Sequence, residues 1–291
     1  LKEDYQGYKT VILFQPHRYE RVEMYCDEFT SILKECDNVF ITPPFAAWNL
    51  EKCHETKDLA ARSEVIYFDS NDWEYIATEV VNYCPPSEKT IYAVIGAATV
   101  NKVIPYLRNI IRMNEILMIN PDLELHTDLS WADLTTLSIG SNNPLVALPA
   151  NIAELQALLS YLHVNQIVAL PLGCGSNMVG GDEAYDGVII RLRNGRFSDV
   201  DIDGEDVVSG AGVRLNRFVT KLAEAGLGGE EALIAIPGSV GGAVRMNAGA
   251  HGVEIGDFVT RVEGVRLNGE LWQAEGGSIE WHYRGSDIPI D

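Results

Sequence analysis

The chain has 291 residues, of which 46% are hydrophobic and 9% aromatic, and its formal net charge at pH 7 is −20. This length and composition fit about two globular domains and exclude an intrinsically disordered chain. The negative charge argues against nucleic acid and anionic membranes as partners, because both would be repelled.

The five cysteines show no CxxC spacing, so the sequence indicates neither a disulfide framework nor a metal site, and it fits a reducing cytoplasm. The sequence contains no run of 18 apolar residues, and its N-terminus is not a signal peptide. The chain starts without methionine and stops without an evident closing element. We interpret it as a fragment of a longer polypeptide.

Residues 1–124 predict a parallel α/β domain. Apolar runs that read as buried strands alternate with apolar residues at helical spacing. The strands are expected at 11–14, 39–42, 65–68 and 92–96, and the helices around 22–33 and 100–111. Strands separated by helices form a parallel sheet with right-handed crossovers, and ligands bind at the tips that follow the strands.

The segment FQPHRYER, residues 14–21, follows the first expected strand. It presents His17, Arg18 and Arg21 together at the start of a helix, where positive charge opposes the helix macrodipole. Binding of a carboxylate or phosphate would explain these side chains, since arginine matches planar anions in bidentate fashion. A solvated first turn with incidental charge explains them equally well, and the spacing alone does not decide between the two.

FQPHRYER resembles the motif F-Q-P-H-R-Y-[ST]-R in the C-terminal domain of UDP-N-acetylmuramate–L-alanine ligases, with Glu20 as its departure. The resemblance extends to about residue 113 and implies that His17, Arg18 and Arg21 bind the carboxylate of incoming L-alanine.

Two further family motifs are altered in this half of the chain. Residues 45–49 read FAAWN where the family has Y-A-A-R-E, and residues 96–100 read GAATV where it has G-A-G-D-I. No GxxxxGK[ST] phosphate loop occurs in the sequence. This half is therefore expected not to ligate anything alone.

We place the domain boundary near residue 124, because residues 114–136 lack a clean period. A short strand is expected at 145–148. Asn151 then precedes an amphipathic helix, with Glu154 as a capping-box acid.

The next buried strand leads into GCGSNM, residues 173–178, called here the first glycine-rich loop. Consecutive N–H groups in such a turn form a nest for phosphate oxygens, and Ser176 and Asn177 add donors. No helix begins directly after the loop, so it is not a GxGxxG dinucleotide fingerprint. By itself it is weak evidence for a ligand. We interpret Cys174 as a small filler rather than a redox thiol.

The second glycine-rich segment, residues 236–252, reads IPGSVGGAVRMNAGAHG. Glycine adopts positive φ and lets another group approach the main chain closely. We interpret the segment as a cradle for a large flat or anionic ligand, with a plain surface loop or linker as the alternative. Together the two glycine-rich stretches suit one long dinucleotide.

Residues 126–291 resemble the UDP-N-acetylenolpyruvoylglucosamine reductases. The shared motifs are Thr136-Leu137, both glycine-rich stretches, GVIIRL at 187–192, SGAGV at 209–213 and YRGS at 283–286. The resemblance implies the FAD-binding fold of vanillyl-alcohol oxidase, with two α/β subdomains before a substrate domain. It also implies FAD as cofactor, NADPH as reductant and an enolpyruvyl UDP-sugar as substrate.

The residues that this resemblance assigns to FAD lie in the two glycine-rich stretches. They are Gly173, Gly175, Ser176, Asn177, Met178, Ile236, Pro237, Gly238, Ser239, Gly241, Gly242, Ala243, Asn247, Ala248, Gly249 and Gly252. It assigns substrate contact to Tyr283 and catalysis to Arg284, whose guanidinium would stabilise an enolate. An exposed arginine beyond a strand is the alternative for Arg284.

The proton-donating serine of the reductases lies in a G-S-x-F-x-N-P stretch that these 291 residues lack. FAD binding without turnover is therefore expected of this chain. The expected fold class is α/β and α+β: a ligase-C-terminal-like parallel-sheet domain at 1–124, and a flavin domain at 125–291 without its substrate domain. The leading interpretation is a cytoplasmic fusion of the two peptidoglycan-precursor enzymes. An FAD oxidase of the same fold and a non-catalytic remnant stay open.

Overall fold

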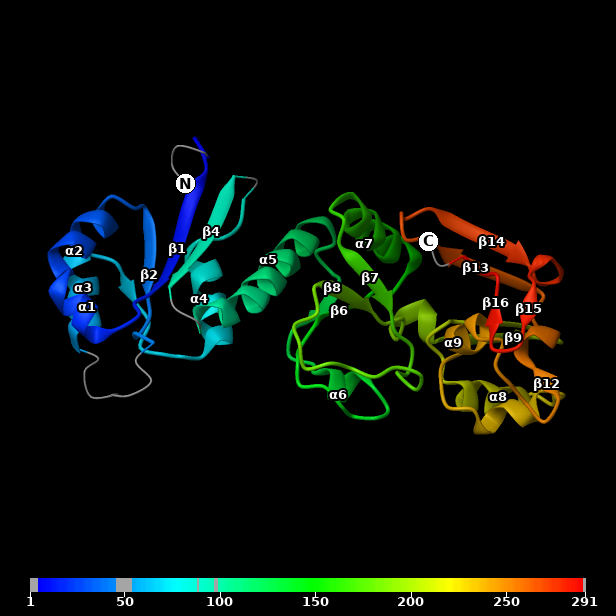
Figure 1. The fold of residues 1–291 in the computed structure, drawn as a ribbon. Helices are drawn as coiled ribbons and strands as arrows, with labels where there is room; N and C mark the ends of the chain where they lie inside the picture. Colours follow the sequence, from blue (N-terminus) through cyan, green and yellow to red (C-terminus); the bar gives the residue numbers. More distant parts are fainter. Residues whose placement is uncertain (1–4, 46–53, 88, 97–98, 290–291) are drawn as a thin grey trace. The chain divides into compact units, whose positions relative to one another are not determined.

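The computed structural model describes residues 5–45, 54–87, 89–96 and 99–289 (Figure 1). The chain divides into two units, residues 1–115 and 116–291. The division falls inside helix α5 (Ile104–Ile119), whereas the expected boundary lay near residue 124.

The first unit contains a parallel sheet. Its strands are β1 (Lys9–Gln15), β2 (Asn38–Ile41), β3 (Ile66–Tyr67) and β4 (Thr90–Gly96), in the order β3-β2-β1-β4. All three strand pairings are parallel, so the predicted parallel arrangement is confirmed. The carboxyl ends of the strands therefore share one edge of the sheet.

Helices cover both faces of this sheet. They are α1 (Tyr19–Met24), α2 (Cys26–Lys34), α3 (His54–Ser63), α4 (Trp73–Tyr83), the 3-10 turn η2 (Val100–Val103) and α5. Figure 1 shows α1 to α3 on one side of the sheet and α4 on the other. Successive residues of a strand face opposite sides, so Val11 and Leu13 pack toward α4 while Ile12 and Phe14 pack toward α1 and α3.

The single helix expected over residues 22–33 is wrong. The chain forms two helices that meet at Tyr25, whose φ of −116° and ψ of 27° are not helical. Tyr25 and Ile32 are 47% and 60% exposed, so neither contributes to a buried apolar face. The break rotates the second helix, so that one continuous apolar stripe does not form.

The second unit begins with a mixed four-stranded sheet. Its strands are β5 (Glu124–His126), β6 (Leu145–Leu148), β7 (Val168–Pro171) and β8 (Gly187–Ile190), in the order β5-β6-β8-β7. Only β5 pairs antiparallel. Figure 1 shows α6 (Trp131–Leu134) and α7 (Ile152–Val164) on opposite sides of this sheet. The N-cap predicted for α7 is confirmed, because the Asn151 side chain accepts from the Glu154 N–H at 3.0 Å.

The rest of the second unit contains α8 (Leu215–Glu224), α9 (Val240–Arg245) and strands that form antiparallel pairs. The pairs join β9 (Val200–Asp203) to β10 (Asp206–Ser209), β11 (Gly249–Ala250) to β12 (Val253–Glu254), β13 (Arg261–Val265) to β14 (Leu271–Glu275), and β15 (Trp281–His282) to β16 (Gly285–Ser286). Four 3-10 turns link them: η3 (Gly195–Ser198), η4 (Glu231–Ala235), η5 (Ile255–Asp257) and η6 (Gly276–Ser278).

Helix α9 lies inside the second glycine-rich segment, which was expected to be a loop. Its start is capped by Ser239, and Val240 and Ala243 face the apolar cluster around Val213 and Leu233. Buried packing therefore overcomes the low helix propensity of the two glycines in this turn.

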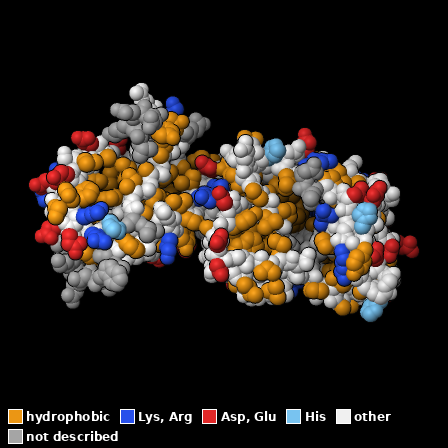
Figure 2. All heavy atoms as spheres, viewed as in Figure 1, with side chains coloured by type: hydrophobic (Ala, Val, Ile, Leu, Met, Phe, Trp, Pro, Cys, Tyr) orange, Lys and Arg blue, Asp and Glu red, His pale blue; other side chains and the backbone are white. Residues whose placement is uncertain are grey.

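Acidic side chains are spread over the visible face of each unit in Figure 2 and do not form one patch. Within the described ranges, no helix combines the length and the apolar character needed to span a bilayer.

The first prediction concerns His126 on the edge strand β5. Its ring nitrogens lie 2.8 Å from a Glu124 carboxylate oxygen and 3.2 Å from one of Asp128. The pKa of His126 is raised, mainly by the bond to Glu124. A raised pKa adds stability that is complete below about 6.5 and is lost as the pH rises through the folded value.

Chemical denaturation of the wild type and His126→Gln across pH 5 to 9 checks this. The stability difference between them should shrink as the pH increases, while the other histidines affect both proteins alike. A difference that does not change with pH would show that the two carboxylates do not favour the protonated ring.

Candidate functional site

The two glycine-rich stretches meet in the second unit. A Cβ placed on Gly173 would lie 2.5 Å from the Ser239 hydroxyl oxygen. Real Cβ atoms do not come so close, so residue 173 must lack one for the two backbones to approach. The structure thus brings together two stretches that are far apart in the sequence.

The first glycine-rich loop packs against the backbone at the end of α6 and is hydrogen-bonded to it. Gly175 has φ +71°, and a Cβ there would overlap the Leu134 carbonyl oxygen and lie 2.7 Å from the Thr135 Cα. The Gly175 carbonyl accepts a hydrogen bond from the Thr136 N–H at 3.1 Å. Among the described residues, no acceptor is bonded to the backbone N–H groups of residues 173–177, so these donors have no partner. Such a set of N–H groups is a nest for an anion.

The second glycine-rich segment is fixed to the turn that follows β10. The N–H groups of Val240 and Gly241 donate to the carbonyls of Val213 and Ala211 at 2.8 and 2.9 Å. A Cβ on Gly241 would lie 2.8 Å from the Ala211 Cβ, so this contact also needs glycine. Residues 209–213, another motif of the sequence resemblance, therefore support the segment.

Two glycines of the second segment border open space. Gly238 has φ +152° and Gly252 has φ +81°, and a Cβ on either would meet no atom within 4 Å. Their glycine character is set by the backbone conformation and not by contacts within the chain. Each leaves backbone without a side chain open to a ligand, as close approach of a planar group requires.

The end of the second segment holds the hairpin that carries Arg284. Arg245 donates from Nη1 to the Ser286 carbonyl at 2.6 Å, and the Ser286 hydroxyl donates to the Arg245 carbonyl at 3.1 Å. Asn247, which is 1% exposed, donates to the His282 carbonyl at 3.2 Å and to Glu254 at 2.6 Å. These bonds tie the β15–β16 hairpin to the end of α9.

Arg284 and Tyr283 form the tip of this hairpin. Arg284 has φ +62°, and its guanidinium lies 5.4 Å from the Tyr283 ring centroid. Both side chains are exposed, Tyr283 by 84%. Within the described part of the chain, no other side chain encloses the guanidinium. The catalytic role of Arg284 and the substrate role of Tyr283 stay predictions.

The three residues expected to bind L-alanine lie in the segment that follows β1, and all are exposed. His17 stacks on Phe45, with ring centroids 6.2 Å apart. Arg18 is the N-cap of α1, and Arg21 lies in the last turn of the same helix. The altered motif positions 46–49 and 97–98 lie outside the described residues. The role of this tip stays a prediction.

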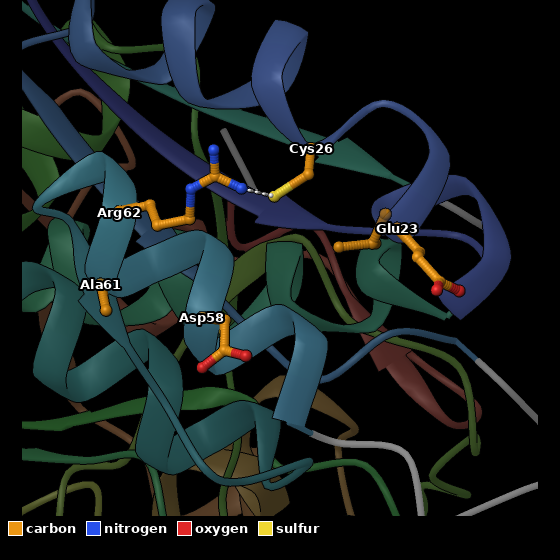
Figure 3. Close-up of a pocket in the computed structure, with 6 residues that line it drawn as sticks. Glu23, Cys26, Asp58, Ala61 and Arg62 are labelled. Atoms are coloured by element: carbon orange, nitrogen blue, oxygen red, sulfur yellow. Dashed lines mark hydrogen bonds between the residues drawn. The ribbon is translucent and has the colours of Figure 1, made fainter.

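A pocket of about 400 Å³ lies in the first unit between α1, α2 and α3 (Figure 3). In it, Arg62 donates to the Cys26 sulfur at 3.0 Å and pairs with Asp27. None of the predicted site residues lines this pocket, so it is separate from the sites considered above.

Sequence reasoning assigned no role to Arg191, which the structure places under the first glycine-rich loop. Its Nη2 donates to the Gly173 carbonyl at 3.3 Å. The sequence feature that could have identified Arg191 is its position directly after the fully buried strand β8, where a charged residue is unusual.

Several known proteins are similar in sequence to this chain. A sequence model of the FAD binding domain matches residues 144–275, which include both glycine-rich stretches. The UDP-N-acetylenolpyruvoylglucosamine reductase of Methylorubrum extorquens is 40% identical over 173 residues, covering 59% of this chain and 56% of the reductase. The Paracoccus denitrificans reductase is 39% identical over 169 residues.

The chain thus spans about half the length of the curated relatives it matches. A solved reductase structure from Thermus caldophilus shares 32% identity, with a TM-score of 0.48 and coverage of 57% of each chain. The sequence comparisons support the expected FAD-binding domain and its relation to the reductases.

The second prediction concerns the first glycine-rich loop. Gly175→Ala should lower the free energy of unfolding by about 3 kcal/mol, because it combines positive φ with overlap of the Leu134 and Thr135 backbone. Gly181→Ala is the matched control, since its Cβ would find its nearest atom at 3.9 Å. Chemical denaturation of both variants decides the matter. Equal stabilities would contradict the close approach at Gly175.

Proposed function

We propose that the second unit is the FAD-binding part of an oxidoreductase that reduces the enolpyruvyl ether of a UDP-sugar to a lactyl ether in peptidoglycan precursor synthesis. The observation that carries this proposal is the contact between Gly173 and Ser239 within the FAD binding domain match. The identity to the reductases supports the choice of reaction.

The residues present fit FAD. The free N–H groups of residues 173–177 would take the diphosphate oxygens. The side-chain-free surface at Gly238 and Gly252 would take the flavin and its ribityl chain, which need close approach to the backbone. When bound, FAD supplies hydride transfer, with NADPH as the proposed reductant.

Arg284 would act on the substrate. Reduction adds a hydride to the terminal alkene carbon and a proton to its neighbour, and negative charge passes onto the conjugated carboxylate between these events. A guanidinium directed at that carboxylate stabilises the charge by about 3 kcal/mol in a dry site. The bonds from Arg245 and Asn247 would hold the Arg284 hairpin in place for this role.

For the first unit, we propose binding of the L-alanine carboxylate by His17, Arg18 and Arg21. The support is their exposure at the carboxyl end of β1, in a parallel sheet where ligands bind at such tips. A ligase fused to a reductase would use the reductase product as its substrate, since the lactyl carboxylate is the group that receives alanine.

The third prediction tests the flavin proposal. The purified 291-residue chain should retain FAD. When the chain is joined to the reductase segment that carries the G-S-x-F-x-N-P stretch and the substrate domain, anaerobic NADPH should bleach the flavin absorbance and the enolpyruvyl UDP-sugar should restore it. Flavin that is bleached by alcohols in an oxygen-consuming reaction, and not by NADPH, would indicate an oxidase instead. A chain that retains no flavin would indicate a non-catalytic remnant.

The fourth prediction separates binding from chemistry. Arg284→Met should leave FAD affinity unchanged, because the exposed hairpin tip contacts neither glycine-rich stretch through its side chain. In the chain extended by the reductase substrate domain, it should slow reoxidation of the reduced flavin by the UDP-sugar about 100-fold, as expected when one charge-stabilising donor is removed. Stopped-flow absorbance gives the rate. Reoxidation as fast as in the wild type would exclude a catalytic role for Arg284.

A further inference from the structure

Arg191 is a buried cation without a counter-charge. It follows β8 and is 4% exposed. Its guanidinium makes one hydrogen bond, from Nη2 to the Gly173 carbonyl at 3.3 Å, while its buried Nε has no partner. Among the residues that the structure describes, no carboxylate forms an ion pair with it. Burying an unpaired charge is costly, so a structural role alone does not explain this residue.

The surrounding charges increase this cost. Burial is the main cause that lowers the pKa of Arg191, to about 10; repulsion by Arg193 and Arg214 adds to it, and the interaction with Cys174 opposes it. The guanidinium therefore remains charged at neutral pH. The chain holds 42 acidic residues against 22 basic ones, yet three arginines gather here. Such a local excess of positive charge is the arrangement expected around a bound anion.

The first glycine-rich loop lies directly on Arg191 with its donors available. The carbonyls of Gly173 and Gly175 are both engaged, one by Arg191 and the other by the Thr136 N–H. The N–H groups of residues 173–177 have no partner among the described residues. Holding the carbonyls in this way leaves the N–H groups for an external acceptor.

We propose that Arg191 is a positioning residue for a nucleotide diphosphate: its buried guanidinium holds the Gly173 carbonyl so that the loop presents its N–H groups, and its charge offsets that of the phosphates. Arg193 and Arg214, which are both exposed and interact electrostatically with Arg191, would lie at the edge of this diphosphate site. The inference rests on the proposed function in taking the diphosphate to be that of FAD.

The test compares FAD with riboflavin, which has the same ring system and no phosphate. Both are titrated into the full chain and followed by flavin fluorescence, and inorganic pyrophosphate is added separately in thermal unfolding. Arg191→Met removes the charge and the donors, and Arg191→Lys keeps the charge without the Nε group. Arg217→Met on α8 is the control, because it makes the same change in net charge at an exposed position.

In Arg191→Met we expect FAD affinity to fall at least about tenfold while riboflavin affinity stays unchanged, as fits the loss of charge-assisted hydrogen bonding. Pyrophosphate should raise the unfolding temperature of the wild type and of Arg217→Met, but not of Arg191→Met. Arg191→Lys should recover part of the preference for FAD, which a merely space-filling role would not produce.

Equal losses of FAD and riboflavin affinity in both Arg191 variants, or an unchanged preference for FAD, would overturn the inference. Failure of the proposed function gives a different result. If the wild-type chain binds pyrophosphate through Arg191 but has no affinity for FAD, the inference about Arg191 as part of a diphosphate site holds and the proposed flavin function is contradicted.

Discussion

The second unit depends on the close approach of two backbones at Ser239. This residue is 4% exposed and caps α9 by accepting a hydrogen bond from the Gly242 N–H. Its backbone forms an isolated antiparallel β-bridge with the backbone of Arg214. Its hydroxyl occupies the space that a side chain at Gly173 would need. One small residue thus fixes the start of α9, the turn after β10 and the position of the first glycine-rich loop. The proposed cofactor seat exists because these three elements meet there.

Electrostatics as well as packing determines whether the proposed cofactor site can bind a diphosphate. A chain with a net charge of −20 repels anions at long range, so an anion must be held by groups at short range. The free N–H groups of the loop and the buried Arg191 supply such groups, and the neighbouring arginines reinforce them. The same acidic surface that argues against nucleic acid is therefore compatible with binding a diphosphate where arginines give a local positive charge.

Sequence patterns predicted the regular elements better than their details. Runs such as 11–14 and 92–96 became strands, and Asn151 became an N-cap, because these signals depend on neighbouring residues alone. The helix break at Tyr25 and the formation of α9 were not predicted. The helix is interrupted at Tyr25 although the spacing of apolar residues around it is helical. Helix α9 contains glycines, and it is stabilised by packing against the apolar cluster around Val213.

For the proposed site, the sequence by itself determined its chemical character. Glycine-rich runs, the Ser-Asn pair at 176–177 and Arg284 indicated a nucleotide cofactor and anionic chemistry, since residue type alone sets backbone freedom and charge. Only the tertiary structure decided which groups lie together. It joined Gly173 to Ser239, fastened the Arg284 hairpin to α9, and buried Arg191 beneath the loop. Contacts between residues so distant in sequence arise from how strands and helices pack, and no local pattern encodes them.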